Sequence, residues 1–464
     1  MSEEQRQIDE LLKRLAALEA EVERLKAENA ELRRRLGKNS QNSHKPPSSD
    51  GYRKKSVRPA LPKQEKRAPG GSPGHKGKTL RQVEQPDKAH VHLPSSCSTC
   101  GRTMRAEEKY SIVGKRQVFD LPEPKLEVIE HRLGQIECCG QVQSGQYPAY
   151  VKARVQYGPG VRALVTKLSI DHKMPLEQIC GLFSDLYGYE LNSETVESTL
   201  EQGHSLTAPL EAHVIQELKR ATAVHFDETG LRVAGKLHWL HTAGNASYTY
   251  LFVHAKRGKK ALQSEKSVLK DFTGYAIHDC LASYFSFAEA KHGLCNAHLL
   301  RELQALAEEN SQWAQAMRDL LLELHQELSG STLSTQAADL LRHRYRQILR
   351  QADEEEPPPK VKQGKGRPKN TPGRNLLKRL QQHEEAVLAF ALMEGVPFTN
   401  NLAERDLRPA KVKQKVSGCF RTVLGAEIYA RLQAIIATCR KQGRNIFATL
   451  RDIFSYQPVS LLAG

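Results

Sequence analysis

Residues 223–254 read AVHFDETGLRVAGKLHWLHTAGNASYTYLFVH. The stretch opens with a short apolar run, 223–226, that ends at Asp227. Two further runs, 236–243 and 247–254, are rich in aromatic and β-branched residues, a composition typical of strands. We therefore expect three consecutive strands here, the first of which carries a carboxylate, Asp227, at its end.

Beyond these strands the chain alternates between helical and apolar stretches. A polar helical stretch begins at Gly258, and a fourth short strand, 274–278, ends at a second carboxylate, Asp279. A fifth strand is expected at 291–294 and a helix at 298–309. Three meandering strands followed by alternating helix and strand are the element order of an RNase H-like core, which is an α/β fold.

A third carboxylate, Glu404, lies much later, just inside a helix that Asn400 and Asn401 can cap. Asp and Glu are mostly solvated, so carboxylates directly after apolar strands are unexpected. Phosphodiester cleavage needs an activated water and a stabilised leaving oxygen, and two Mg²⁺ ions roughly 3.5–4 Å apart provide both. Because Mg²⁺ prefers carboxylate oxygen, Asp227, Asp279 and Glu404 are candidate ligands of a two-metal nuclease site if the fold brings them together.

The short sequence segments around these carboxylates resemble those of a known family. They are HFDETG (225–230), HDCLASY (278–284), LCNAHLLREL (294–303) and NNLAERDLRP (400–409), preceded by GKNSQNSHKPPSSDG (37–51) and GGSPGHKGKTL (70–80). In this order, over nearly the whole chain, they resemble the insertion sequence 66 family of DDE transposases. The resemblance implies that Asp227, Asp279 and Glu404 form the catalytic triad of a bacterial transposase. Such an enzyme uses Mg²⁺ or Mn²⁺ to cut element-end DNA and transfers the freed 3′-hydroxyl strand into target DNA. Companion proteins of the same element are further expected partners.

Other residues are expected to support this chemistry. Cys295-x2-His298 looks like an element that several DDE families carry after the second Asp, and Arg301 lies beside it. Glu302 is the rival for the third carboxylate. On a helix, Arg408 lies one turn from Glu404, either to hold the scissile phosphate or as a weak surface ion pair. Candidate DNA-binding cations follow the third carboxylate: Arg405, Lys411, Lys413, Lys415 and Arg421.

Composition agrees with a nucleic-acid enzyme. The 464 residues carry a formal net charge of +16, which favours a polyanionic partner such as double-stranded DNA. There is no apolar run of 18 residues and the N-terminus is charged, so we expect a cytoplasmic protein without a membrane span. Nine cysteines, an odd number, argue against a disulfide framework.

Residues 1–37 predict a parallel coiled coil that makes a homodimer. An a/d heptad seam contains Asn29 at an a position, where a buried polar residue favours an in-register pair; its members are Ile8, Leu11, Leu15, Leu18, Val22, Leu25, Asn29, Leu32 and Leu36. The alternative is a single amphipathic helix packed on its own domain.

Residues 38–90 hold 13 Lys/Arg against 4 Asp/Glu and are expected to be a basic linker that does not fold alone. It either tracks phosphates or serves as a solvated tether.

Residues 91–150 resemble a zinc ribbon, with a β-like stretch from 117 to 135 between its halves. Its candidate ligands are Cys97, Cys100, Cys138 and Cys139, since structural zinc takes thiolates from paired knuckles. The second pair is adjacent, which leaves open a site made of Cys139 and His131, or a metal-free ribbon.

Residues 151–215 predict three helices, 160–171, 174–188 and 192–203, the last capped by Ser193. They form either a helix-turn-helix that reads DNA or a plain connector.

The core is expected at 216–310 and 396–464, the latter holding the last catalytic helix and C-terminal helices in which Pro409 ends or kinks the first. A helical insertion, 311–395, separates them, with helices at 311–328, 336–351 and 375–394 and a basic loop whose Gly366-Arg367-Pro368 is like an AT hook. Two other functions stay open. One is a non-catalytic zinc-ribbon DNA-binding dimer on a degenerate transposase core, and the other is a structure-specific nuclease.

Overall fold

The structure, a computed structural model, describes residues 12–32 and 80–461, with gaps at 13, 20, 27, 30, 31, 106, 108, 329–330 and 360–369. The chain divides into two units, Arg53–Val128 and the remainder. The described residues between Leu12 and Leu32 are helical, as the heptad pattern predicts. Most of the basic linker and the Gly366-Arg367-Pro368 loop lie outside the described residues. None of the described helices is long and apolar enough to cross a membrane.

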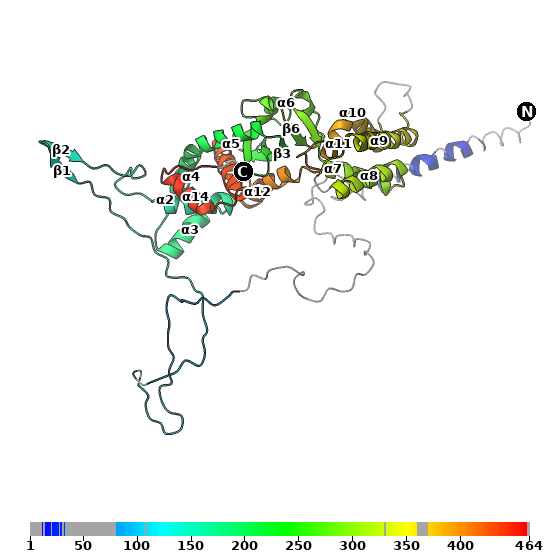
Figure 1. The fold of residues 1–464 in the computed structure, drawn as a ribbon. Coiled ribbons are helices and arrows are strands. Elements are labelled where there is room, and N and C mark those ends of the chain that lie inside the picture. Colours follow the sequence, from blue (N-terminus) through cyan, green and yellow to red (C-terminus); the bar gives the residue numbers. More distant parts are fainter. Residues whose placement is uncertain are drawn as a thin grey trace, which may run out of the picture. The chain divides into compact units, whose positions relative to one another are not determined.

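A five-stranded mixed sheet forms the centre of the larger unit (Figure 1). Its strands are β3 (Ala223–Val233), β4 (Lys236–Gly244), β5 (Thr249–His254), β6 (Tyr275–His278) and β7 (Lys291–Leu294), in the spatial order β5-β4-β3-β6-β7. The first three pair antiparallel, and β6 pairs parallel with both β3 and β7. The five predicted strands and the α/β class therefore agree with the structure.

The first strand is longer than the sequence suggested. β3 continues past Asp227 to Val233, where Ala234 and Gly235, both with positive φ (47° and 76°), close a tight turn into β4. Two-residue turns of this kind match the twist of an antiparallel pair. The prediction that Asp227 ends its strand is wrong, because the alternating residues 229–233 keep pairing with β4.

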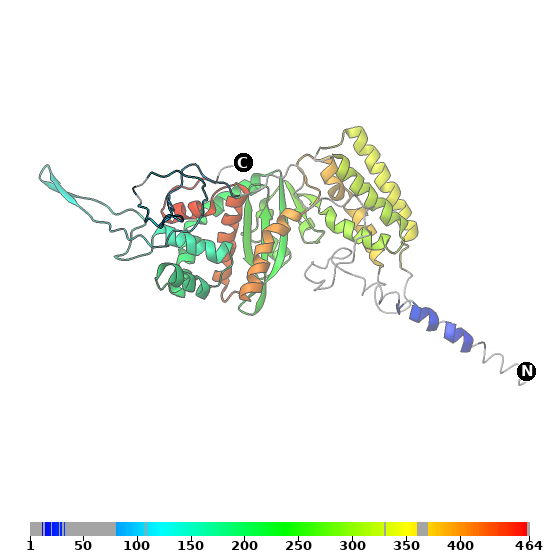
Figure 2. The same cartoon turned by 90° about the horizontal axis from the view of Figure 1, so that it is seen from below.

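Helices cover both faces of this sheet. On one face, Leu231, Leu240 and Leu251 pack against α12 (Asn401–Ser417) and α13 (Val423–Lys441); these are the orange and red helices beside the sheet in Figure 2. On the other, Phe226 and Phe252 pack against α5 (Ala208–Arg220) and the 3₁₀ turn Val268–Asp271. The alternation of side chains along β3 therefore supplies two separate cores.

The insertion makes a helical body beside β7. Its helices are α8 (Gln312–Leu328), α9 (Thr335–Glu355), α10 (Pro372–Gln382) and α11 (Glu384–Leu392). They share one core with α7 (Asn296–Ala307), in which Trp313, Tyr345 and Leu376 are buried. The single helix expected at 375–394 is instead two helices, because the backbone leaves the helical region at His383 (φ −121°, ψ 32°).

Before α5 the chain forms the three helices that the sequence predicted. They are α2 (Pro159–Thr166), which continues into a π-helical turn to Asp171, α3 (Leu176–Tyr187) and α4 (Ser193–Leu206). Asn192, not Ser193, caps α4 by accepting the N–H of Thr195. α2 lies against α14 (Ile446–Phe454) and α4 against α13. The exposed side of α4 carries Glu194, Glu197 and Glu201, an acidic surface that does not suit contact with phosphates.

The second cysteine pair lies in a small hairpin, β1 (Gln135–Cys138) and β2 (Gln141–Ser144). Cys139 and Gly140 form its two-residue turn, both with positive φ. The β-like stretch expected at 117–135 has no strand among the described residues before Gln135.

We predict that Gly274→Ala weakens the pairing of β6 with β3. A Cβ at this position would lie 2.7 Å from the carbonyl oxygens of both Ala221 and Thr222. Thr222 O accepts the N–H of Tyr275 at 2.8 Å, the bond that begins this pairing. Such overpacking against backbone typically costs about 1–3 kcal/mol, measured as a lower free energy of unfolding in urea.

The matched control is Gly230→Ala in β3, where the nearest atom to an added Cβ is Leu237 Cδ1 at 3.4 Å. This substitution should change the stability little. Equal losses for the two variants would contradict the close approach at Gly274.

Candidate functional site

Asp227 lies in the middle of the sheet on β3 and is partly buried. One of its carboxylate oxygens, Oδ1, accepts the backbone N–H of Glu228 at 2.8 Å. Burial raises the pKa of Asp227 well above its usual range, and the negative charges of Glu228, Asp279 and Glu404 raise the pKa further. Both predicted partners are thus near enough for their charges to act on Asp227.

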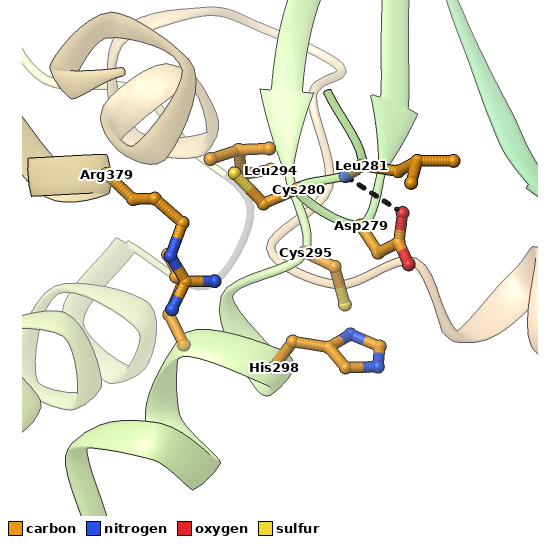
Figure 3. Close-up of a pocket in the computed structure, with 8 residues that line it drawn as sticks. Asp279, Cys280, Leu281, Leu294, Cys295, His298 and Arg379 are labelled. Atoms are coloured by element: carbon orange, nitrogen blue, oxygen red, sulfur yellow. Dashed lines mark hydrogen bonds between the residues drawn. The ribbon is translucent and has the colours of Figure 1, made fainter. Parts of the chain in front are cut away.

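Asp279 follows β6, and the sheet explains why it lies beside Asp227. The parallel register pairs His225 with Ile277, so that each carboxylate stands two residues beyond a paired position. Equivalent positions on neighbouring parallel strands lie side by side on one face of a sheet. The Asp279 carboxylate also accepts the N–H of Leu281 at 3.3 Å, drawn as a dashed line in Figure 3.

Glu404 reaches this site from the first turn of α12. Its Oε1 lies 3.8 Å from Nε2 of His298, which is on the first turn of α7. One residue of the Cys295-x2-His298 element therefore lies close to the candidate third carboxylate.

Asn400 joins the three elements that carry the site. Its Nδ2 donates to the carbonyl oxygen of Phe226 (2.7 Å), and its Oδ1 accepts from Nδ1 of His225 (2.8 Å). Its backbone N–H donates to Sγ of Cys295 (3.0 Å). Asn400 occupies the N-cap position of α12, yet its side chain makes no cap hydrogen bond. The expected cap is therefore a tertiary link between β3, the start of α7 and the start of α12.

The Phe226 carbonyl fixes the orientation of the Asn400 amide and thereby the tautomer of His225. Burial lowers the pKa of His225 to about 4, so the ring is neutral near pH 7. The Asn400 amide must turn Nδ2 toward the Phe226 carbonyl, which leaves Oδ1 as an acceptor for His225. His225 consequently carries its proton on Nδ1.

Cys295 has a structural role in this arrangement. It is buried, and burial raises the pKa of its thiol. The sulfur accepts the Asn400 N–H, and it borders a cavity of about 220 Å³ that Asp279, Cys280, His298 and Arg379 also line (Figure 3).

Glu302, the rival third carboxylate, has a different partner. It lies one turn beyond His298 on α7 and forms an ion pair with Arg379 of α10. Arg301, its neighbour, is partly buried on the same helix. Glu404, by contrast, is among the carboxylates whose charges raise the pKa of Asp227.

Sequence reasoning missed Glu228, a buried carboxylate next to Asp227. It accepts from the Tyr284 hydroxyl (2.6 Å) and from Nε of Arg257 (2.7 Å), and the Arg257 guanidinium lies over the Trp239 ring. Burial raises the pKa of Glu228 although both partners favour its ionised form. The only signal was a charged residue inside a strand, since neither partner is near in sequence.

Most of the predicted cations follow Glu404 along α12, which continues through Pro409 to Ser417, whereas Arg421 lies beyond the end of this helix. Of the two expectations for Pro409, the one that it ends the helix is wrong. Arg405, Arg408, Lys415 and Arg421 are exposed. Two lysines are less available: Lys411 donates to the Gly230 carbonyl (2.9 Å), and burial lowers the pKa of Lys411 and of Lys413.

The predicted metal ions need side chains that could hold them. Within the described ranges, no group of three or more His, Cys, Asp or Glu side chains is arranged to hold a metal ion. Cys138 and Cys139 are exposed at the hairpin turn, with their sulfurs 3.6 Å apart. Cys97 and Cys100 form a turn of their own, in which Gly101 N–H donates to Cys97 O. The predicted zinc site therefore finds no support.

We predict that Asn400→Ala destabilises the protein. The substitution leaves the Nδ1–H of His225 and the Phe226 carbonyl buried without their partner, and each such loss typically costs about 1–3 kcal/mol. The measurement is the free energy of unfolding in urea. The exposed neighbour Asn401 is the control, since Asn401→Ala should cost far less. Equal stability of the two variants would contradict the link.

Comparison with known families places this geometry in context. A family described as "Transposase IS66 family" matches residues 154–428, and a "Family of unknown function (DUF6444)" matches residues 1–81. No curated protein matches the chain. The first match contains the whole five-stranded sheet together with Asp227, Asp279 and Glu404. Since it covers more than half of the 464 residues, the chain belongs to the IS66 family of transposases.

Proposed function

We propose that this transposase is a DDE enzyme whose catalytic carboxylates are Asp227, Asp279 and Glu404. It cleaves DNA at the ends of its element and transfers the freed 3′-hydroxyl strand into target DNA. The observation that carries the proposal is the parallel pairing of β3 with β6, which puts Asp227 and Asp279 at equivalent positions on neighbouring strands. Asp279 and Glu404, from β6 and α12, both raise the pKa of Asp227 on β3.

The donor set fits Mg²⁺ or Mn²⁺. Three carboxylates that repel one another in a partly buried site gain stability from a divalent cation. Mg²⁺ usually takes only one or two protein carboxylates and completes its shell with water and substrate phosphate. A complete protein cage is therefore not needed before DNA binds. When bound, the metal ions would supply an activated water and would stabilise the leaving oxygen.

The remaining side chains of the site would orient these carboxylates and the DNA. His298 approaches Oε1 of Glu404, which limits the directions that this carboxylate can take. Asn400 fixes the start of α12 relative to β3. Arg405 and Arg408, exposed on the same helix as Glu404, would contact phosphates close to the cleaved bond.

Dimerisation by the N-terminal helix would hold two element ends in one complex. Its seam residues Leu15, Leu18, Val22, Leu25 and Leu32 are 47–63% exposed in the single chain. A row of exposed apolar side chains at heptad spacing is buried when two such helices pair.

One prediction of this proposal concerns the cleavage of duplex DNA that carries the element's own ends, with Mg²⁺ or Mn²⁺. Asp227→Asn, Asp279→Asn and Glu404→Gln should each lower the cleavage rate by more than the roughly 10–100-fold that the loss of an outer partner costs. Binding of the same DNA should persist, because these groups hold metal and not phosphate directly.

Glu302→Gln tests the rival third carboxylate and should lower the cleavage rate far less than Glu404→Gln. If Glu302→Gln abolished cleavage and Glu404→Gln did not, the third carboxylate would be Glu302. Tight binding without any cleavage, even with companion proteins added, would point to a non-catalytic DNA-binding protein. Cleavage without strand transfer would point to a nuclease.

A second prediction concerns the dimer. The double substitution Leu18→Glu and Leu25→Glu places charges in the apolar seam and should convert a dimer into a monomer, as measured by light scattering. Glu23→Gln, away from the seam, is the control and should leave the mass unchanged. A parent protein that is monomeric at micromolar concentration would contradict the coiled coil.

A further inference from the structure

Arg379 comes to the candidate site from the insertion. It lies on α10, whose apolar side is fixed by the buried Leu376, Leu377 and Leu380. From there its side chain extends to the cavity that Asp279, Cys295 and His298 line from the core (Figure 3). The insertion therefore does more than add surface, because one of its side chains forms part of the wall next to a candidate catalytic carboxylate.

Glu302 holds this arginine in place. Its Oε2 accepts from Nη2 of Arg379, and the two side chains remain 21% and 28% exposed. Among the described residues, Glu302 is the only carboxylate within ion-pair distance of Arg379. A guanidinium has five N–H donors in a planar fork, so one carboxylate oxygen leaves most of the donors for another acceptor.

The position of the pair argues against a purely structural role. An ion pair that only joined α7 to α10 would not need to border a cavity. Here the cation lines the cavity together with Asp279. Arginine stays protonated under all ordinary conditions, and its fork suits the paired oxygens of a phosphate.

We propose that this cavity is a phosphate-binding subsite in which Arg379 binds a backbone phosphate of the DNA close to the cleaved bond. Glu302 is then a positioning residue that orients the guanidinium. The subsite rests on the proposed function, since it assumes that DNA enters beside Asp279. It assigns the insertion a defined task, which is to supply a phosphate contact that the sheet and α12 do not provide.

Arg374 offers a matched control on the same helix. It forms an ion pair with Asp353 of α9, and its guanidinium also donates to the Glu356 carbonyl. Both contacts lie within the insertion, and Arg374 does not line the cavity. Arg374→Gln therefore removes a cation and an ion pair from α10 without touching the subsite.

The test measures DNA binding by full-length protein that carries Asp227→Asn, so that no cleavage interferes. The probe is a fluorescein-labelled duplex of the element's end, titrated at several salt concentrations. Each phosphate contact contributes about 0.9 to the slope of log K against log salt. Arg379→Gln should reduce that slope by about 0.9 and weaken binding roughly ten-fold, whereas Arg374→Gln and Arg379→Lys should keep the slope.

A second probe locates the contact. Duplexes with a single neutral methylphosphonate are compared at successive positions around the cleavage site. One position should weaken binding of the parent protein and have no effect on Arg379→Gln, because the two changes remove the same interaction. If Arg379→Gln does not fold, Arg379→Lys takes its place and should show a reduced effect at that position.

Two results would overturn the subsite: an unchanged salt slope in Arg379→Gln, or equal changes in Arg379→Gln and Arg374→Gln. Cleavage by protein with Asp227 intact is measured separately. A protein that never cleaves yet shows the Arg379 effect would keep the subsite and lose the proposed function. A protein that cleaves but shows no Arg379 effect would keep the proposed function and lose the subsite.

Discussion

The Asn400 amide is the contact on which the site depends. One side chain bonds to the His225 ring and to the Phe226 carbonyl on β3, while its backbone N–H bonds to the Cys295 sulfur at the start of α7. These groups are buried, so each bond would be costly to lose. Asp227, His298 and Glu404 each lie within four residues of a group that takes part in these bonds. A displacement at this position would therefore move all three at once.

The sheet supplies the second constraint. The parallel pairing of β3 with β6 puts Asp227 and Asp279 at equivalent positions, and their like charges oppose each other. Glu228 adds a third negative charge beneath them, which the Tyr284 hydroxyl and the Arg257 guanidinium partly offset. The resulting carboxylate cluster is unfavourable without a cation. Under the proposed function, a bound divalent cation would offset this repulsion.

The insertion and the core meet at the same place. Helix α7 begins at the Cys295-x2-His298 element and, one turn later, offers Glu302 to Arg379 of α10. The helical body between the second and third carboxylates is thus connected to the cavity wall by a charged pair. The two candidates for the third carboxylate have separate tasks in this arrangement: Glu404 near Asp227, and Glu302 with an arginine.

Local pattern determined much of this protein from the sequence alone. The alternation and composition of residues 223–254, 274–278 and 291–294 predicted the five strands. The resemblance of short segments to a transposase family supplied Asp227, Asp279 and Glu404 as candidate catalytic carboxylates. Even the local errors have local causes, such as the tight turn at Ala234 and Gly235 that extends β3, or the break at His383. Those features depend on a few residues whose alternative conformations differ little in energy.

Tertiary structure alone decided how the site is held together. The bond between His225 and Asn400 spans 175 residues, and the pair of Glu302 with Arg379 spans 77. The hydrophobic periodicity of the sequence does not indicate such contacts, because they depend on how separate elements pack and not on the secondary-structure propensity of either element. For the same reason the sequence suggested Asn400 as a helix cap and left Glu302 as a rival of Glu404 for the third carboxylate. Burial and geometry gave each of them a different partner.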